Sequence, residues 1–501
     1  MSFDRKKKFV LNTITSVLNQ ILLLISGFLL PRAMLFVYGS EVNGLVSSIS
    51  QFLGFISFMQ AGVGAVVQAA LYKPLADNDW IEVSKIYTSA QKFFRCIAVI
   101  FLFYTLLVAA LFPFITDTPF NSGYVFLLVI AVSINLFFQY YFGLSNSLLL
   151  NADQKGYVSL CYQFIATLLN VIVSMIMIYS EASVLNVKLV GNIVCLIAPL
   201  GMYFYVSKNY RINSKMVYTE EPIKNKWSGF GQHISAVVTD NTDVIVLTLF
   251  SSLSNVSVYS VYHMIVSALR LFIVSLSNGI QSLFGNMLAN NEHQQIKILF
   301  DRFEMAFAYL TTFLFSCAMC LSVNFVKVYT RNVTDANYVQ PLFEVLISIA
   351  FAIFCYRTIY YTLIKAAGQF KETQIPAVIE AVLNILVSII AVRNLGLVGV
   401  AVGTIVAAVF RTVHCAWYIS KNIIMRPLFL FWKNMAANSV VYILTYLLTV
   451  NIPMRNETYI SWLSLALLVS LVNFAILTLV YCLAYRGEFF ALLRALVHKF
   501  R

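Results

Sequence analysis

The chain is an almost unbroken series of hydrophobic stretches between residues 9 and 485, with no polar segment long enough to form a domain. Each stretch runs for about 20 to 30 residues, which is enough for a helix to cross a hydrocarbon layer roughly 30 Å thick. Hydrophobic residues make up 60% of the 501 residues and charged residues only 11%. A soluble core cannot bury so much apolar surface, so the sequence predicts an all-α polytopic membrane protein.

Breaks at Gly, Pro and charged residues divide these stretches into about fourteen predicted transmembrane spans. The spans are expected at 9–38, 42–72, 87–116, 122–150, 157–180, 184–207, 229–252, 255–290, 298–330, 338–366, 372–393, 396–421, 432–452 and 460–485.

Positive charge is distributed unevenly between the two sides of these spans. The chain starts with Arg5-Lys6-Lys7-Lys8 ahead of an apolar stretch too long for a signal peptide, so we expect an uncleaved first span. With that end in the cytoplasm, most of the 34 Lys and Arg residues fall on the inner side. The positive-inside rule then predicts that both termini are cytoplasmic, and it explains the net charge of +13 without a nucleic-acid partner. The outer side receives Lys188, Lys327, Arg331, Arg393 and Arg455.

All eight cysteines fall within predicted spans, where they act as small apolar side chains, so we expect no disulfide framework. The Cys317 and Cys320 pair lacks a neighbouring His or acid, and we assign no metal site to it. No cofactor is expected beyond a coupling Na⁺ or H⁺.

Four short sequence islands recur at an offset of about 214 residues, which indicates an internal repeat. The pairs are Ser40-Glu41-Val42 with Ser254-Asn255-Val256, Ala152-Asp153-Gln154 with Ala367-Gly368-Gln369, Asn170 to Ser174 with Asn384 to Ser388, and Tyr205 to Asn209 with Tyr418 to Asn422. The repeat predicts an N-lobe of six spans over 1–207, a cytoplasmic linker at 208–228 and a C-lobe of six spans over 229–422. An extra pair of spans follows at 423–485, and then a cytoplasmic tail at 486–501.

An even number of spans in each half keeps the halves in the same orientation, as in transporters built from parallel repeats. Such halves can enclose a central cavity and rock about it for alternating access. The alternative is common ancestry of the two halves without a cavity.

Four arginines lie inside predicted spans, where each costs roughly 2.5–3.5 kcal/mol at a helix centre unless it has a partner or water. They are Arg32, Arg270, Arg357 and Arg411, with His263, Tyr360 and Lys365 near them in sequence. One interpretation is a cationic, tyrosine-lined cavity for an anionic ligand, because guanidinium pairs bidentately with phosphate. The other is salt bridging to acids within the spans.

Asp240, Asp243 and Glu380 are acids that also lie within the spans. Asp240 and Asp243 share a helix face, and Glu380 shares one with Asn384 four residues later. Their oxygens can hold Na⁺ or relay a proton, so these four residues form a candidate coupling-ion site. Their alternative role is to pair with the arginines. The cluster from Glu292 to Glu304 is interpreted as a solvated inner-loop face.

Three features together resemble the polysaccharide-transporter branch of the multidrug/oligosaccharidyl-lipid/polysaccharide (MOP) exporter superfamily, whose best-known members are the Wzx-type flippases. The first is Leu29-Leu30-Pro31-Arg32 followed by Tyr38-Gly39-Ser40-Glu41-Val42-Asn43-Gly44. The second is Asn241-Thr242-Asp243 leading through Leu253-Ser254-Asn255-Val256 to Tyr259-Ser260. The third is the six-plus-six repeat within fourteen spans. The resemblance covers essentially the whole chain.

This resemblance implies two lobes in a V shape, similar to a MATE transporter, around a central cavity. It implies a flippase, not an enzyme, that moves an undecaprenyl-diphosphate-linked oligosaccharide from the inner to the outer leaflet of a bacterial cytoplasmic membrane. Such cargo serves O-antigen (lipopolysaccharide), capsule or exopolysaccharide synthesis, alongside polymerase and assembly partners. Cavity arginines would engage the diphosphate, and a cation gradient would drive reorientation. Asp243, Glu380 and Asn384 are compatible with the Na⁺ site of a relative.

Two other functions remain open. A MATE-type multidrug or cation antiporter would favour a cavity rich in acids, whereas the four arginines named above slightly outnumber the three acids named with them. A membrane glycan polymerase or ligase would carry a large outer loop, and no predicted outer loop exceeds about twenty residues.

Overall fold

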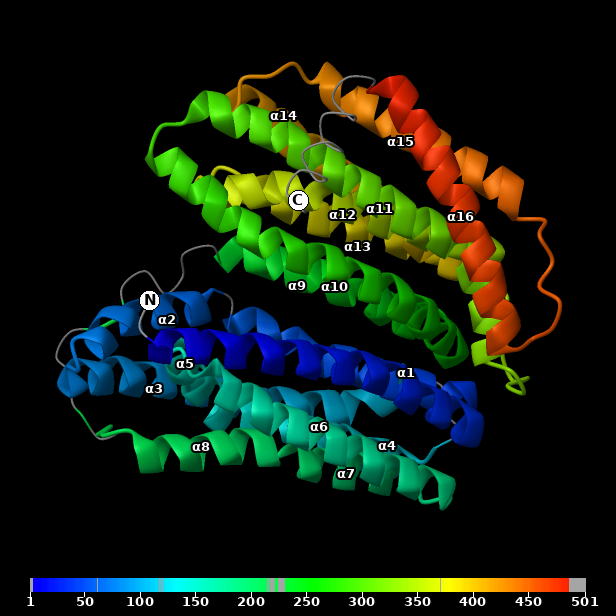
Figure 1. Ribbon diagram of the computed structural model, residues 1–501. Helices are drawn as coiled ribbons and strands as arrows, with labels where there is room; N and C mark the ends of the chain where they lie inside the picture. The colour runs from blue at the N-terminus through cyan, green and yellow to red at the C-terminus, as the bar shows by residue number, and fades with distance from the viewer. Residues whose placement is uncertain are drawn as a thin grey trace. The chain divides into compact units, whose positions relative to one another are not determined.

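The computed structural model describes residues 3–60, 62–116, 118, 120–213, 216, 221–223, 230–369 and 371–485. Within these ranges all regular secondary structure is helical, and none of the described residues forms a strand (Figure 1). Helical segments coincide with each of the predicted spans, so the all-α prediction is confirmed. The predicted tail at 486–501 lies outside the described residues, as does much of the linker at 208–228.

The chain forms two compact units, Met1–Ser257 and Val258–Arg501. Unit 1 contains α1 (Phe3–Gly54), the 3-10 turn η1 (Phe55–Gln60), α2 (Val63–Ala76), α3 (Trp80–Ile115), α4 (Ser122–Phe138), the π-helical turn η2 (Gln139–Gly143), α5 (Leu144–Ala152), α6 (Gly156–Tyr179), α7 (Val184–Cys195), α8 (Ile197–Asn209) and α9 (Phe230–Phe250). Unit 2 contains most of α10 (Leu253–Ala289), then α11 (His293–Tyr329), α12 (Pro341–Ala366), α13 (Gln374–Leu395), α14 (Leu397–Asn422), α15 (Phe429–Thr449) and α16 (Tyr459–Ala484).

The first two predicted spans are joined in one long helix. No loop separates them at 39–41; instead α1 bends at Gly39, whose φ of 83° is open to glycine because it lacks a Cβ. After η1, α2 completes the second span. Eleven helices among the described residues are long and apolar enough to cross a membrane, one of them the merged Val10–Gln60.

Large apolar side chains cover the outside of the helices that are expected to face lipid. On α16, Leu471, Leu479 and Leu483 are each at least 60% exposed. An exposed apolar surface of this extent would favour aggregation in water, but it is the expected surface of a helix in a bilayer.

In unit 1, α1 packs along α6, and α3 packs on α4. α9 also belongs to this unit, because it packs on α1 and η1. Hydroxyls of Ser48 and Thr248 lie 2.7 Å apart, and Asn43 Nδ2 donates to Ser257 Oγ at 2.8 Å. The boundary between the two units therefore falls within α10, between Ser257 and Val258, and not in the predicted linker at 208–228. The proposed division into six-helix lobes remains a prediction.

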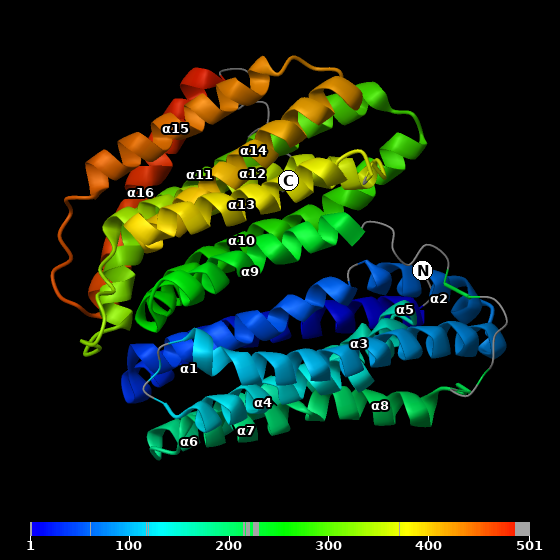
Figure 2. The ribbon, with the colours of Figure 1, turned by 180° about the vertical axis from the view of Figure 1, so that it is seen from behind.

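In unit 2, α13 and α14 are the most extensively packed pair, and α14 also packs on α12 (Figure 2). α15 and α16 pack on each other and on α11. This arrangement places α12, α13 and α14 together around the buried charges described next.

Candidate functional site

Two buried arginines share one buried glutamate in unit 2. Arg357 of α12 donates a hydrogen bond to Oε1 of Glu380 on α13, and Nε of Arg411 on α14 lies 3.7 Å from Oε2 of the same carboxylate. The three residues are 8%, 7% and 3% exposed, respectively. Three helices thus bring together charges that lie 23 to 54 residues apart in sequence.

A third arginine joins them through an aromatic ring. The guanidinium of Arg270 lies 3.9 Å from the ring centroid of Phe354, and that of Arg357 lies 4.4 Å from the same ring. We call Arg270, Arg357, Arg411 and Glu380 the arginine cluster. Within it, Arg357 and Arg411 share one carboxylate, which leaves a surplus of one positive charge between them. Cation–π contacts of this kind stabilise a guanidinium without neutralising it.

The close packing of α13 on α14 depends on Gly403. A Cβ at this position would lie 2.1 Å from Ser388 Oγ and 3.1 Å from the backbone oxygen of Asn384. The first half of the chain has the same contact, because a Cβ at Gly191 would lie 2.6 Å from Asn170 Oδ1 and 3.0 Å from Ser174 Oγ. The repeated Asn-to-Ser islands therefore mark equivalent small-residue contacts between adjacent helices.

Several polar atoms beside the cluster lack hydrogen-bond partners among the described residues. They are Nη1 of Arg411, Oδ1 of Asn384 and Oγ of Ser388, and all three are buried. Asn384 Nδ2 donates a hydrogen bond to Thr404 Oγ1 at 3.3 Å. Leaving such a buried group unpaired costs about 1–3 kcal/mol, so these atoms are suited to bind water, an ion or a polar ligand.

The other predicted ligand-binding residues do not contact Glu380, although His263 packs on Phe351, whose ring centroid lies 6.0 Å from the Arg270 guanidinium. Arg32 is exposed on α1 in unit 1. The His263 ring stacks on Tyr259 and lies within 3.3 Å of Ser267 Oγ. Lys365 Nζ lies 5.1 Å from the centroid of Tyr361.

Tyr360 belongs to a second charged network. Its hydroxyl donates to Glu304, and Arg426 binds the same carboxylate with two hydrogen bonds of 2.6 and 2.8 Å. Arg426 also donates to Asp301 at 2.6 Å. The interpretation of the Glu292 to Glu304 cluster as solvated is wrong for Glu304, which is only 5% exposed.

Arg426 was not singled out by the sequence because it follows the end of α14. Burial alone would lower the pKa of its guanidinium, but the hydrogen bonds to Glu304 and the nearby carboxylates raise that pKa above its ordinary value. Asp301 and Glu304 stand three residues apart on one helix face, and that spacing was the available signal for a buried partner. The network ties the segment after α14 to α11.

The candidate coupling-ion residues are divided between the two units. Asp240 is exposed and Asp243 is 6% exposed, both on α9, whereas Glu380 and Asn384 lie on α13. In the described part of the chain, no group of three or more His, Cys, Asp or Glu side chains is placed to hold a metal ion. Glu380 already interacts with two arginines, so a Na⁺ ion would compete with them for it.

Two further charged groups, one buried and one half-buried, were not predicted as site residues. Glu344 on α12 is fully buried, and although Ser348 donates to its Oε1 at 2.6 Å, its Oε2 has no partner among the described residues. Lys188, which the distribution of positive charge assigned to the outer side, lines a pocket within unit 1.

No protein-family model and no curated protein matches this sequence. Several solved structures share its fold. The lipid II flippase MurJ, in an inward closed conformation, superposes with a TM-score of 0.67 at 14% identity, over 93% of this chain and 98% of MurJ. The chain has the fold of MurJ.

MATE transporters share this fold as well. An inward-facing multidrug resistance MATE family transporter of the MOP superfamily gives a TM-score of 0.65 at 12% identity, over 82% of this chain and 95% of the transporter. A mutant of the MATE transporter VcmN from Vibrio cholerae gives 0.60 at 11% identity, over 85% of this chain and 99% of VcmN. The expectation of a MOP-type fold is therefore confirmed, whereas Wzx-like specificity stays a proposal.

Proposed function

We propose that this protein is a Wzx-like flippase. It would move an undecaprenyl-diphosphate-linked repeat unit from the inner to the outer leaflet of a bacterial cytoplasmic membrane, for O-antigen, capsule or exopolysaccharide synthesis. The observation that carries the proposal is the arginine cluster, with its surplus of positive charge and an unpaired Arg411 nitrogen. The fold shared with the MurJ flippase over 93% of the chain supports it.

A diphosphate suits this cluster chemically. It carries about two negative charges, which must be shielded from hydrocarbon when the head group crosses. Guanidiniums bind phosphate oxygens with paired, charge-assisted hydrogen bonds. In the absence of cargo, Glu380 holds Arg357 and Arg411; on binding, the phosphates replace Glu380 as the partner of one or both arginines. Alternating access would then carry the head group across while the polyprenyl tail stays in lipid.

Coupling to Na⁺ or H⁺ is part of the same proposal. Because two arginines already neutralise Glu380, a cation is repelled there, and Asn384 alone offers little charge. The acids of α9, Asp240 and Asp243, are the other candidates for the coupling ion. Asp243 is the stronger candidate because it is buried.

The competing function is a MATE-type multidrug or cation antiporter, since MATE structures share the fold. Cationic cargo would be repelled by the surplus positive charge of the arginine cluster. This charge balance favours an anionic cargo.

The test is a deletion strain in which lipid extracts are measured by mass spectrometry. The flippase proposal predicts accumulation of a complete undecaprenyl-diphosphate-linked repeat unit, reversed by the native gene. Complementation with Arg411→Gln should restore transport at least roughly tenfold less well, while Arg393→Gln, at an exposed position of α13, should restore it fully. Unchanged lipid-linked glycans combined with new sensitivity to cationic dyes would overturn the proposal in favour of the antiporter.

A further inference from the structure

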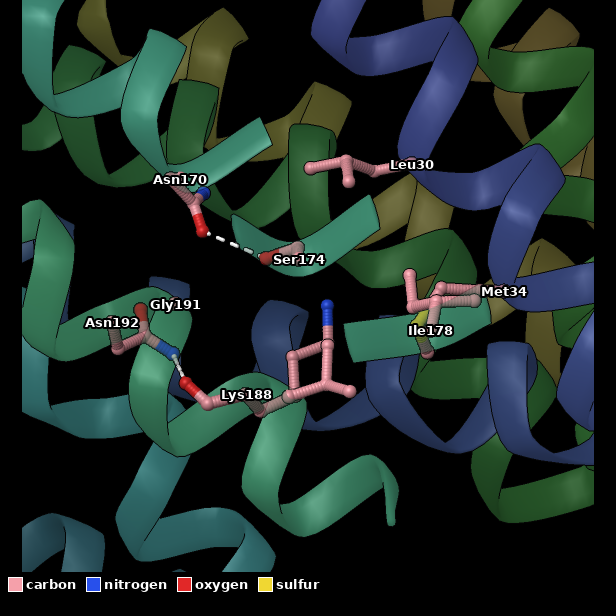
Figure 3. Close-up of a pocket in the computed structure, with 9 residues that line it drawn as sticks. Leu30, Met34, Asn170, Ser174, Ile178, Lys188, Gly191 and Asn192 are labelled. Carbon is pink, nitrogen blue, oxygen red and sulfur yellow. Dashed lines mark hydrogen bonds between the residues drawn. The ribbon is translucent and has the colours of Figure 1, made fainter. Parts of the chain in front are cut away.

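Unit 1 contains a pocket between α1, α6 and α7 that the proposed function does not use (Figure 3). It encloses about 370 Å³ of empty space, including its open mouth. Leu30 and Met34 of α1 and Ile178 of α6 form apolar walls. Polar groups come from Asn170 and Ser174 of α6 and from Lys188 and Asn192 of α7. The pocket is therefore a small polar site inside a membrane-embedded bundle.

The ammonium group of Lys188 points into this space (Figure 3). The nearby amides are partly occupied: Ser174 Oγ donates to Asn170 Oδ1 at 3.0 Å, and Asn192 Nδ2 donates to the backbone oxygen of Lys188 at 2.8 Å. None of the residues that line the pocket is acidic. The pocket thus presents N–H donors and one positive charge without a carboxylate to balance them.

Lys188 stands in the second turn of α7 and is half-buried. A lysine within a span is costly unless water or an anion accompanies its charge. One structural explanation would be that the lysine is needed for helix packing. The second half of the chain argues against it.

In that half, Asn384, Ser388 and Gly403 repeat the contact made by Asn170, Ser174 and Gly191. Lys188 stands three residues before Gly191, and the residue three before Gly403 is Val400, which is fully buried. The same helix contact therefore forms with an apolar residue at this position. The packing of the repeat therefore does not require a lysine at this position. None of the lining residues balances its charge, and a bound anion would do so.

We propose that the Lys188 pocket binds a phosphate group. Lys188 on α7 and the Asn170 amide on α6 offer N–H donors from two walls, which suits the tetrahedral oxygens of phosphate. The phosphate can come from a lipid head group or from the soluble phase. The proposal stands on this pocket alone and does not depend on the flippase proposal.

The first experiment measures thermal unfolding of the purified full chain in detergent while inorganic phosphate replaces chloride at constant ionic strength. Phosphate should raise the unfolding midpoint of the native protein and of the control Lys327→Met, a lysine on α11 outside the pocket. Lys188→Val, which copies Val400, should weaken the apparent affinity at least roughly tenfold, and Lys188→Arg should retain most of it. An equal phosphate response in the Lys188→Val variant would overturn the proposal.

A second experiment distinguishes the two sources of phosphate. Native mass spectrometry counts phospholipids retained by the native protein and by Lys188→Val. One fewer retained lipid in the variant assigns the pocket to a lipid head group, and equal retention with a phosphate-dependent midpoint assigns it to soluble phosphate. No difference in either measurement would rule the site out.

A measurement on the native protein keeps the test decisive if Lys188→Val fails to fold. Acetylation of Lys188, followed by peptide mass spectrometry, should slow at least severalfold when phosphate or phospholipid is present. Acetylation of Lys327 should not change. Equal rates at Lys188 with and without either ligand would contradict the proposal.

Discussion

At the residue scale, the arginine cluster is the part of the molecule on which the proposed function rests. Glu380 pairs with Arg357 and Arg411, as the salt-bridge interpretation predicts. One carboxylate cannot neutralise two guanidiniums, however, and Arg270 adds a third charge beside Phe354. The pairing itself was not predictable, because each partner lies on a different helix.

The first prediction concerns Glu380. Glu380→Gln leaves two buried arginines without a charged partner, which should lower the free energy of unfolding by about 3–5 kcal/mol. Glu372→Gln, at an exposed position just before α13, should change it by less than about 0.5 kcal/mol. Denaturant unfolding in detergent measures both. Equal stability of the two variants would show that Glu380 does not hold the arginines.

At the element scale, small residues decide how closely helices approach. Gly191 and Gly403 place α7 on α6 and α14 on α13 through the repeated Asn-to-Ser islands. The islands were visible in the sequence as a repeat, but their contact with these glycines was not. In the same way, the bend at Gly39 keeps two predicted spans within α1, because a glycine with positive φ lets the helix continue after the kink.

The second prediction tests this close approach. Gly403→Val should destabilise the protein by about 1–3 kcal/mol or more, because its Cβ would overlap backbone and side-chain atoms of α13. The matched control is Gly27→Ala on α1, where a Cβ meets no atom within 4 Å. That change should be neutral or stabilising by up to about 1 kcal/mol, since alanine favours helix. Thermal unfolding of both variants and of the native protein measures these changes. A Gly403→Val variant as stable as the native protein would contradict the close contact.

At the scale of the whole molecule, hydropathy predicted the helices well because a bilayer leaves the backbone few options. An apolar segment in lipid must satisfy its own hydrogen bonds and therefore becomes a helix. The neighbours of a single helix were less accessible to sequence: α9 packs on α1 and η1 and so belongs to unit 1.

The third prediction concerns orientation across the membrane, which rests on the charge asymmetry of the loops. In a cysteine-free background, Asn456→Cys, between α15 and α16, should react with a membrane-impermeant maleimide added to intact cells. Asn290→Cys, between α10 and α11, should react only after the cells are opened. Both positions are exposed, so access depends on the side of the membrane. The reverse labelling pattern would place the termini outside.

By itself, the sequence determined that this chain is a helical membrane protein with about fourteen spans and an internal repeat, because length and hydropathy are local properties of the chain. It also pointed to Arg357, Arg411 and Glu380 as charges within the spans. Only the tertiary structure decided that Arg357 and Arg411 share Glu380, that Arg426 is buried against Glu304, and that Lys188 faces a pocket. A buried charge takes its partner from whichever helix packs beside it, and that neighbour is set by contacts between residues far apart in the chain.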